Sequence, residues 1–473
     1  MSSEKRRSLY LFSNDLRLDD NPALNHALGA DEASTLYYRD TSSPWLFEGA
    51  AAWWLEQNLF SLADSLSQHK LQLNFLSGEG INNLTQLIKK HDFTEVCIAR
   101  AYTKYDREQQ AKLSQWCKEN DVHFKRFPGV LLFEPEQIKN NQGSFYKVFT
   151  PFYKNTQQGS PRSPQVFCDN YASREYRFDS EKLSDWKLYS AKPDWAAPLS
   201  DRWTPGENAA QACLKNCAED IIDHYEEERN SLGSNRTSHL SPYLNLGILS
   251  PARIWQDISA GANMETAQAW LRQLVWREFN YHLLFHQPDM ESSEFQEKFS
   301  HFDWQKDSDT LRLWQKGLTG YPAVDAAMNE LWQTGWMHNR ARMIVASFLT
   351  KHLQQHWLCG ARWFWHTLID ADLANNTGGW QWTAGCGADA APYFRIFNPI
   401  TQGEKFDKSG HYVRKWLPAL KNLPHKYLFA PWQAPEEVLQ EAGITLGENY
   451  PLPIVEHKFA RERALEAYSA LSR

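Results

Sequence analysis

The first 127 residues alternate short apolar runs with amphipathic segments, and this alternation limits the possible folds more than any other feature of the chain. The expected strands are Leu9–Phe12, Thr35–Tyr38, Leu71–Leu76, Val96–Ala99 and His123–Phe127. The expected helices between them lie near Asn21–Leu28, Ala50–Ser67, Ile81–His91 and Arg107–Asn120. Strands that alternate with helices predict a parallel sheet covered by helices on both faces. The order of the strands does not follow from this pattern.

The pattern changes twice beyond this segment. From about Val130 to Pro205, Pro, Gly and Ser recur without a persistent period, which indicates a linker with short helices at most. From Asn208 onward helical periodicity takes over and strand signals disappear. A chain of 473 residues is also too long for one ordinary core. We therefore predict an α/β plus all-α protein, with a parallel α/β sheet domain over residues 1–130, a linker over 131–205 and a helical domain over 206–473.

Several classes of protein are disfavoured by simple totals. No run of eighteen apolar residues exists, so we expect neither a transmembrane helix nor a membrane partner. The first residues lack the apolar core of a secretory signal. The seven cysteines follow no pattern, which favours a reducing cytoplasm. Cys213 and Cys217 are four residues apart, but no further Cys or His pair joins them, so no metal site is expected there.

The stretch from Gly335 to Pro399 mixes large aromatic rings with polar side chains. Its members are Trp336, Trp357, Trp363, Trp365, Trp380 and Trp382 together with Asn339, Asp370, Asp372, Asn375 and Asn376. Buried carboxylates and amides cost free energy unless something hydrogen-bonds them. A large planar ligand with polar edges would satisfy both the rings and the carboxylates, so this stretch is the predicted ligand site.

A basic segment follows directly. The formal net charge of -7 argues against a protein that coats DNA without discrimination. Nucleic-acid binding needs only a local basic face, however, and residues 395–426 hold seven Lys or Arg against two Asp or Glu. A solvated surface is the alternative interpretation of this run.

The same region resembles the photolyase/cryptochrome flavoproteins, and within them the class I photolyases that act on cyclobutane pyrimidine dimers. The matching pieces are WMHNRARM, LIDADLANN, GGWQW and DAAPYFRIFNPITQGEKFD, and the resemblance extends over essentially the whole chain. It implies a C-terminal helical FAD-binding catalytic domain behind an antenna-type α/β domain. It also implies a monomeric carbon–carbon lyase that repairs UV-damaged DNA under blue light, by electron transfer from excited FADH⁻ to a flipped-out dimer.

The resemblance assigns FAD contacts to specific positions. It places the FAD phosphates at Thr237, Ser238, His239, Leu240 and Ser241, although hydroxyls before a helix also suit plain capping. Asp370 and Asp372 would bind ribose and flavin-ring donors, Arg342 would pair with Asp370, and Asn376 would face the flavin N5. The remaining implied cofactor contacts are Tyr225, Trp270, Gln273, Trp336 and Asn339.

The resemblance likewise implies substrate contacts. Trp276 would stack on the damaged base pair and Gln273 would hydrogen-bond a pyrimidine edge. Asn339 and Met343, which are helical neighbours, would form the floor of the lesion pocket. The other implied DNA contacts are Arg277, Arg340, Trp382, Arg395 and Lys405. An ordinary amphipathic helix is the alternative interpretation of the segment from Trp270 to Arg277.

Three tryptophans, Trp304, Trp357 and Trp380, match the family's chain that carries electrons from the surface to an oxidised flavin. From composition alone, core packing is the alternative. In the α/β domain the family carries a second chromophore, either a folate or a deazaflavin. Asp106 stands where folate-binding members have an acidic residue, whereas the loop TSSPWLFEG has lost their histidine. A folate antenna, a deazaflavin antenna and no antenna all remain open.

Two alternative functions remain open. Class I dimer photolyases usually carry Glu where this chain has Gln273, and Gln is typical of (6-4) photolyases and animal-type cryptochromes. The (6-4) enzymes carry a His-His pair, however, and here the pair is His338-Asn339 with Met343 following, which favours the cyclobutane dimer. A signalling cryptochrome is the second alternative. We expect no long C-terminal extension beyond Arg473, which disfavours it.

Overall fold

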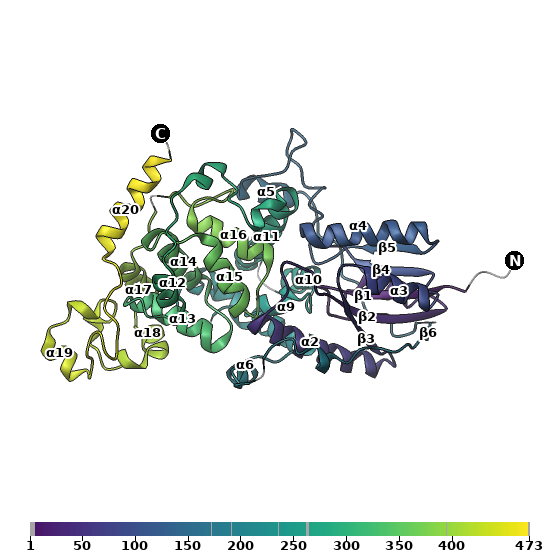
Figure 1. Ribbon diagram of the computed structural model, residues 1–473, viewed down its shortest axis with the longest axis horizontal. Coiled ribbons are helices and arrows are strands. Elements are labelled where there is room, and N and C mark those ends of the chain that lie inside the picture. The colour runs from purple at the N-terminus through teal and green to yellow at the C-terminus, as the bar shows by residue number, and fades with distance from the viewer. Residues whose placement is uncertain are drawn as a thin grey trace. The chain divides into compact units, whose positions relative to one another are not determined.

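The computed structural model describes residues 5–171, 173–190, 192–234, 236–261, 264–393 and 395–471 (Figure 1). The chain divides into two compact units. Unit 1 comprises Met1–Ala196, Trp203–Asp223 and Ser238–Pro288, and unit 2 comprises Ala197–Arg202, His224–Thr237 and Asp289–Arg473. Neither unit is continuous in sequence, and each is described by itself. The domain boundaries at residues 130 and 205 stay a prediction.

Unit 1 contains the predicted parallel sheet. Its strands are β1 (Arg7–Phe12), β2 (Glu32–Asp40), β3 (Leu73–Gly78), β4 (Glu95–Ala99) and β5 (His123–Phe127). They are parallel and lie in the order β3-β2-β1-β4-β5. The helices between them are α1 (Pro22–Ala27), α2 (Gly49–Gln68), α3 (Asn82–Lys90) and α4 (Lys104–Glu119). Every strand and helix expected in this segment is present, and the α/β class is confirmed.

Local chemistry explains where these elements begin and what they bury. Asn21 caps α1 by accepting a hydrogen bond from the Leu24 N–H at 3.0 Å, and Pro22 occupies the first turn. Apolar side chains of β1 and β4, such as Leu9, Leu11 and Val96, are almost fully buried against α3 and α4. Burial of both sheet faces is the reason that these strands read as continuous apolar runs.

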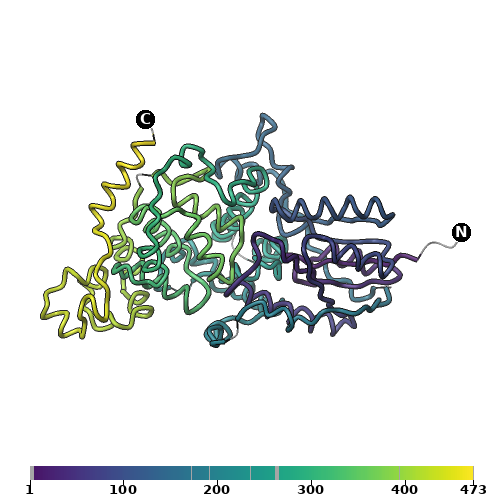
Figure 2. The backbone as a smooth tube through the Cα atoms, in the orientation of Figure 1, coloured from purple at the N-terminus to yellow at the C-terminus, as the bar shows by residue number. Residues whose placement is uncertain are grey.

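The segment between β5 and α7 (Glu207–Asn216) follows a largely irregular path, as the trace in Figure 2 shows. It contains α5 (Phe149–Thr156), but also a two-residue strand, β6 (Arg174–Glu175), that was not expected. β6 pairs in parallel with Glu32 and Ala33 of β2, whereas β3 begins to pair with β2 only at Thr35. The prediction of short helices at most is therefore wrong at this point. β6 covers a strand edge that would otherwise be open, and this long-range pairing leaves no local signal.

The remaining helices of unit 1 are α9 (Ser241–Asn245), α10 (Pro251–Gly261) and α11 (Met264–His286). Two neighbouring residues of α11, Arg277 and Glu278, form a buried ion pair with Nη1 and Oε1 3.1 Å apart, and both side chains bind the backbone at the start of the linker. Glu278 accepts hydrogen bonds from the Leu132 and Phe133 N–H groups, and Arg277 donates to the Val130 carbonyl at 2.8 Å. Two neighbouring side chains thus satisfy both donors and acceptors of the linker backbone.

Unit 2 is helical, as predicted for the C-terminal part of the chain. Its helices are α6 (Ala197–Arg202), α8 (Tyr225–Glu228), α12 (Ser308–Gln315), α13 (Pro322–Thr334), α14 (Asn339–Ser347), α15 (Trp357–Thr367), α16 (Leu373–Ala384), α17 (Pro399–Phe406), α18 (His411–Trp416), α19 (Glu436–Glu441) and α20 (His457–Ala470). Within its described residues only isolated β-bridges occur, at Gln305–Gln355 and Leu446–Tyr450. Gly360 lets α15 approach α16, because a Cβ at that position would overlap the Trp380 ring.

Throughout the described part of the chain, every helix is too short or too polar to cross a lipid bilayer.

The Glu278 carboxyl should make stability depend on pH. Burial raises the pKa of Glu278 to about 7, although Arg277 and the two linker N–H groups act to lower it. The unfolded chain releases this proton near the ordinary glutamate pKa of about 4.3, so stability from this group is complete below that pH and is lost as the pH rises to 7. Between pH 5 and pH 8 the free energy of unfolding should therefore fall by on the order of 3 kcal/mol more in the wild type than in Glu278→Gln.

Denaturant titrations of both proteins at the two pH values measure this difference. Glu108→Gln, on an exposed position of α4, is the control and should follow the wild type. Parallel pH profiles for wild type and Glu278→Gln would contradict the assignment.

Candidate functional site

The polar cluster predicted from the sequence assembles around α14, α15 and α16 in unit 2. Arg342, on α14, pairs with Asp370 through Nη2 and Oδ2 at 2.7 Å, and its Nε donates to the Met337 carbonyl at 2.8 Å. Asp370 is 7% exposed, and its second oxygen, Oδ1, is buried without a hydrogen-bond partner among the described residues. A buried carboxylate oxygen in this state is costly, so it is suited to accept a hydrogen bond from a bound ligand.

Asn376 and Asp372 lie on the first turn of α16. The Asn376 Nδ2 donates to the Ala361 carbonyl at 2.9 Å, and this orientation presents Oδ1 as the free end of the amide for an N–H donor. Asp372 is the N-cap of α16 and accepts hydrogen bonds from the backbone N–H and the Nδ2 of Asn375, both at 2.8 Å. The sequence argument missed this capping role, although Asp before a helix is a recognisable capping signal.

The three predicted electron-transfer tryptophans all lie in unit 2. Trp357 is fully buried at the start of α15, and the His356 ring lies 5.7 Å from it and 5.3 Å from the Trp304 ring. Trp380 is 2% exposed, and its ring lies 5.0 Å from Phe364, which belongs to α15 as Trp357 does. Aromatic contacts thus lead from the half-buried Trp304 through His356 to Trp357, and Trp380 packs against another ring of the same helix, α15.

A carboxylate accompanies this path. Glu294 accepts a hydrogen bond from the Trp357 Nε1 at 3.3 Å and pairs with His356 at 2.8 Å. Burial is the largest single influence and acts to raise the pKa of Glu294, but the hydrogen bonds and charge of its neighbours, His356 first among them, together lower the pKa. Gln381 holds this segment by accepting from the Phe295 N–H and donating to the Met290 and Ser293 carbonyls. Neither residue left a signal in the sequence, since the contacts of Glu294 span 63 positions and those of Gln381 span 86 to 91.

Three guanidinium groups, those of Arg229, Arg340 and Arg395, lie near one another in unit 2, and a DNA-binding face in this region stays a prediction. Burial lowers the pKa of Arg340, and repulsion from the nearby Arg229 and Arg395 lowers it further. The Arg340 guanidinium lies 4.4 Å from the Phe406 ring centroid, and the exposed Lys405 ammonium lies 5.3 Å from it. Like charges gathered this closely are poised to bind an anion. Arg229 was missed because it directly follows the acidic run Glu226–Glu228 in the sequence.

Met343 and Asn339 lie on α14, as expected from their spacing, and Trp382 lies half-buried on α16. Trp336 is 7% exposed just before α14, and the Arg342 guanidinium lies 6.0 Å from its ring centroid. His338 is the N-cap of α14, because its Nδ1 accepts a hydrogen bond from the Arg340 N–H at 3.0 Å.

The residues predicted on α11 belong to unit 1. Trp270 is buried, and Gln273 is partly exposed with its Nε2 donating weakly to the Ala269 carbonyl at 3.4 Å. Trp276 stacks on Phe149, with ring centroids 3.6 Å apart. Arg277 is 8% exposed, and its Nη1 donates to the Val130 carbonyl and to the Glu278 carboxylate; its role in binding a phosphate stays a prediction. A helical face predicted from spacing alone did not reveal this pairing.

The predicted phosphate-binding segment is divided, with Thr237 in unit 2 and Ser238–Ser241 in unit 1. Helix α9 begins at Ser241, and its N-cap residue is Leu240, which makes no side-chain capping bond. The Cys213 thiol contacts the Ser238 carbonyl at 3.0 Å and the Trp203 ring lies beside His239, so unit 1 holds this segment in place. Tyr225, on α8, has the Arg229 guanidinium 5.8 Å from its ring centroid.

A cavity opens in unit 1 at the carboxyl ends of β2 and β3. It has a volume of about 400 Å³ and is lined by Ser42, Glu79, Gly80, Ile81, Asn82, Tyr105, Gln109 and Lys112. Asp40 organises its rim by accepting hydrogen bonds from the Gly80 N–H and the Tyr105 hydroxyl at 2.9 and 2.7 Å. Asp106, considered for the antenna, accepts a hydrogen bond from the Thr103 hydroxyl at 2.7 Å at the start of α4.

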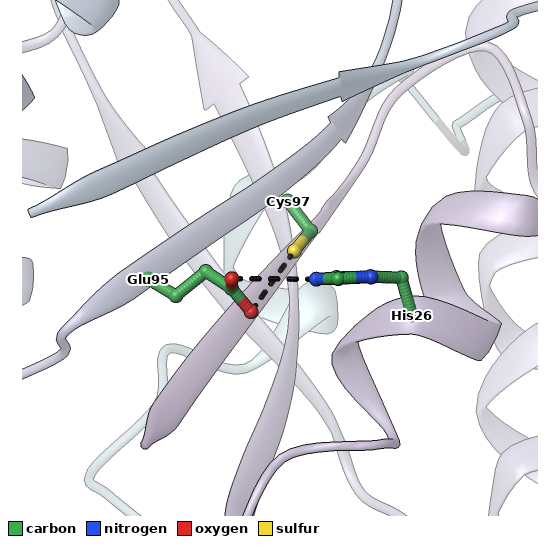
Figure 3. A group of neighbouring side chains, drawn as sticks. All are labelled: His26, Glu95 and Cys97. Carbon is green, nitrogen blue, oxygen red and sulfur yellow. Dashed lines mark hydrogen bonds and ion pairs between the residues drawn. The ribbon is translucent and has the colours of Figure 1, made fainter. Parts of the chain in front are cut away.

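His26, Glu95 and Cys97 form a separate group in unit 1, and their side chains converge in Figure 3. The Glu95 carboxylate lies 3.3 Å from the His26 Nε2 and 3.6 Å from the Cys97 Sγ. Two further cations, Arg6 and Lys125, approach the same carboxylate at 3.8 and 4.0 Å. Because these groups already compensate the charge of Glu95, and because burial raises the pKa of the Cys97 thiol to about 12, we interpret the group as a hydrogen-bonded cluster of the sheet.

Comparisons with known proteins agree with this geometry. The family model described as the FAD binding domain of DNA photolyase matches residues 270–470, and that of DNA photolyase matches residues 8–167. The chain is 42% identical to the deoxyribodipyrimidine photo-lyase of Agrobacterium fabrum, with all of both sequences covered.

The chain belongs to the photolyase/cryptochrome family.

Two further members of this family mark its range. The solved structure of a bacterial class III photolyase from Agrobacterium tumefaciens has a TM-score of 0.95 at 42% identity and covers 100% of this chain and 99% of its own. Cryptochrome-1 of Arabidopsis thaliana is 31% identical over 98% of this chain and 70% of its own length. The predicted family, the photo-lyase enzyme class and an FAD-binding domain are thereby confirmed. We expected class I, and that assignment within the family stays a prediction.

The residues around Asp370 fit FAD. The buried Asp370 Oδ1, which has no partner among the described residues, and the Asn376 Oδ1 can both accept hydrogen bonds from the N–H groups of a polar-edged ring. Asp370→Asn should remove the charge that holds Arg342 and one strong acceptor. Hydrogen bonds to charged groups contribute about 1.5–3 kcal/mol, so we expect FAD to bind roughly 10- to 100-fold more weakly.

The measurement is the FAD content of the purified variant during dialysis. Asp325→Asn is a matched control, since Asp325 is equally buried in unit 2 but is satisfied by Thr319, Gly320 and Tyr450. The control should lose thermal stability and keep its flavin affinity. Equal flavin loss in both variants would refute a direct role for Asp370.

Proposed function

We propose that this protein repairs cyclobutane pyrimidine dimers in DNA in a reaction driven by blue light. The observation that carries the proposal is the site around Arg342, Asp370 and Asn376, set beside an aromatic path and a cluster of arginines within one helical unit. Relatives of full length named deoxyribodipyrimidine photo-lyase support it. When bound, reduced FAD would supply the chemistry: after light absorption it would lend the dimer one electron, and the electron would return to the flavin once the cyclobutane ring has opened.

The chain's own residues have three tasks in this proposal. Asp370 and Asn376 bind and orient the flavin ring, and Arg342 holds the Asp370 carboxylate in place through their ion pair. Arg340, Arg395 and Lys405, with Arg229, hold the phosphates on either side of the lesion. A dimer is poorly stacked and paired, so less free energy is needed to flip it out of the duplex than to flip normal bases. Asn339, Met343 and Trp382 then contact the flipped-out bases.

The structure also bears on which lesion is bound. Gln273 suggested repair of (6-4) photoproducts as the alternative function. The (6-4) photolyases, however, carry two consecutive histidines where this chain has His338-Asn339. In this chain the second position is Asn339, and His338 caps α14 through its Nδ1, so that nitrogen is engaged with the backbone. With His338 engaged as a cap, the Asn339 amide is left to hydrogen-bond a pyrimidine edge, as recognition of a cyclobutane dimer requires. We therefore retain the cyclobutane dimer as substrate.

The cavity lined by Ser42, Tyr105 and Lys112 supports an antenna chromophore in the α/β unit, because it offers an aromatic wall and several polar groups at one edge of the parallel sheet. Folate and deazaflavin both remain candidates. Extraction of the purified protein and the absorbance of the released chromophore distinguish them.

The deciding experiment uses reduced, purified protein under blue light with oligonucleotides that carry either a cyclobutane dimer or a (6-4) photoproduct. We expect repair of the cyclobutane dimer alone, and none in the dark. Gln273→Glu should change this repair only modestly, since a typical hydrogen bond contributes about 1 kcal/mol, whereas Gln273→Ala should lose more. Repair of the (6-4) lesion alone would show that the protein is a (6-4) photolyase, as Gln273 suggests. Light absorption without repair of either lesion would favour a photoreceptor.

Trp380→Phe should block the photoreduction of oxidised FAD and leave repair by chemically reduced enzyme intact. The reason is that Trp380 would be the tryptophan next to the flavin, while repair itself needs only a flavin that is already reduced. Absorbance changes under blue light with an external reductant measure the first effect. Trp314→Phe is a matched control, because Trp314 is a buried neighbour of Trp380 at 6.1 Å that lies outside the predicted path. A wild-type rate in Trp380→Phe would remove Trp380 from the path.

A further inference from the structure

Within unit 1, helices α5 and α11 meet along a row of stacked aromatic rings. The Trp276 ring of α11 lies 3.6 Å from the Phe149 ring of α5, and the two planes are only 5° apart. Phe149 is 1% exposed, whereas Trp276 is partly exposed. Phe279 contacts both rings edge-on, at 5.7 and 5.8 Å. One face of the Trp276 indole is therefore covered by a parallel ring that is itself fixed in the core.

The register of α5 on α11 is held by a second contact. The guanidinium of Arg272, one helical turn before Trp276, lies 5.4 Å from the Phe149 ring centroid and 5.3 Å from that of Tyr153. Phe149 and Tyr153 stack on each other at 5.7 Å. Cation–π contacts of this kind are attractive even where the cation is exposed. Phe149 thus cannot turn away from Trp276 without breaking contacts on both of its sides.

A tryptophan side chain rotates about two bonds, and it loses this freedom when a base stacks on it. A ring that already lies flat against one face of the indole removes most of that freedom before any ligand arrives. Affinity then increases because less ordering remains to be done on binding. Since base–aromatic stacking is a large part of the affinity for unstacked bases, the orientation of the indole has a measurable effect on binding.

We propose that Phe149 is a positioning residue for lesion recognition, which holds the Trp276 indole as a rigid platform for the flipped-out pyrimidine dimer. The inference rests on the proposed function and adds to it a residue of the linker that touches neither flavin nor DNA. Undamaged duplex, which is bound through its phosphates, gains nothing from this platform. Phe149 therefore acts on the discrimination between damaged and undamaged DNA.

The chain provides a matched control on the same helix. Phe152 is as buried as Phe149, at 1% exposure, and it packs against Phe279 at 5.2 Å and His282 at 5.0 Å. A Phe-to-Leu change at either position removes the same apolar volume from the contact between α5 and α11. Only the change at Phe149 removes the ring that is stacked on Trp276.

The test measures the Kd for an oligonucleotide with one cyclobutane dimer and for the same undamaged duplex, with flavin content and Tm recorded for every variant. Phe149→Leu and Phe149→Met should each weaken binding of the dimer by about 3- to 10-fold, from the usual strength of aromatic pairs. Binding of undamaged DNA should stay unchanged. Phe149→Tyr, which keeps the flat ring, should bind like the wild type. Phe152→Leu should lower Tm and leave both Kd values unchanged.

A double-mutant cycle separates positioning from general destabilisation. In the Trp276→Ala background, Phe149→Leu should have no further effect on dimer binding, because the platform is already gone. The inference is overturned if the Phe149 variants behave like Phe152→Leu, if they weaken both DNAs equally, or if their effect persists in the Trp276→Ala background. A wild type that binds both DNAs with one affinity would instead show that the proposed function is wrong, and this inference falls with it.

Discussion

The ion pair between Arg342 and Asp370 is the contact on which the functional half of this protein depends. It ties the first turn of α14 to the segment between α15 and α16, and a backbone bond from Ile369 N–H to the Gly335 carbonyl at 2.8 Å reinforces the same junction. A buried carboxylate with only one partner is unfavourable in a structure that has to be stable by itself. The burial of its second oxygen is compensated only when a ligand donates a hydrogen bond to it. The site therefore suits the flavin, at the expense of the stability of the protein without flavin.

The aromatic residues of unit 2 serve packing and chemistry together. Trp357 and Trp380 are among the most buried side chains, and Gly360 is required because any larger residue would displace the Trp380 ring. Protein interiors are close-packed, so the neighbouring side chains hold these buried rings at fixed separations. The ionised Glu294 beside Trp357 adds a negative charge at a point where such a path would carry positive charge.

Positive charge is concentrated locally in unit 2, although the net charge of the chain is negative. The chain has a formal net charge of -7, yet Arg229, Arg340 and Arg395 lie close enough for their charges to repel one another. Repulsion of this kind is a local cost that phosphate groups would relieve. Attraction between the phosphate backbone and a protein depends on the cations that face it, so a negative net charge is compatible with a local DNA-binding face.

The alternation of apolar runs in residues 8–127 was sufficient to predict every strand and helix within that segment, because hydrophobic periodicity is a local property that burial imposes directly. Arg342, Asp370 and Asn376 were named in advance from the family resemblance of their motifs, and their contacts with the flavin stay a prediction. Other roles were decided only by tertiary contacts. Arg277 turned inward to Glu278 and Val130, His338 became a cap, β6 paired with the open edge of β2, and Phe149 stacked on Trp276. Each of these depends on a partner that a one-dimensional pattern does not contain, because the free energy of a contact is set by the groups that the fold places beside it.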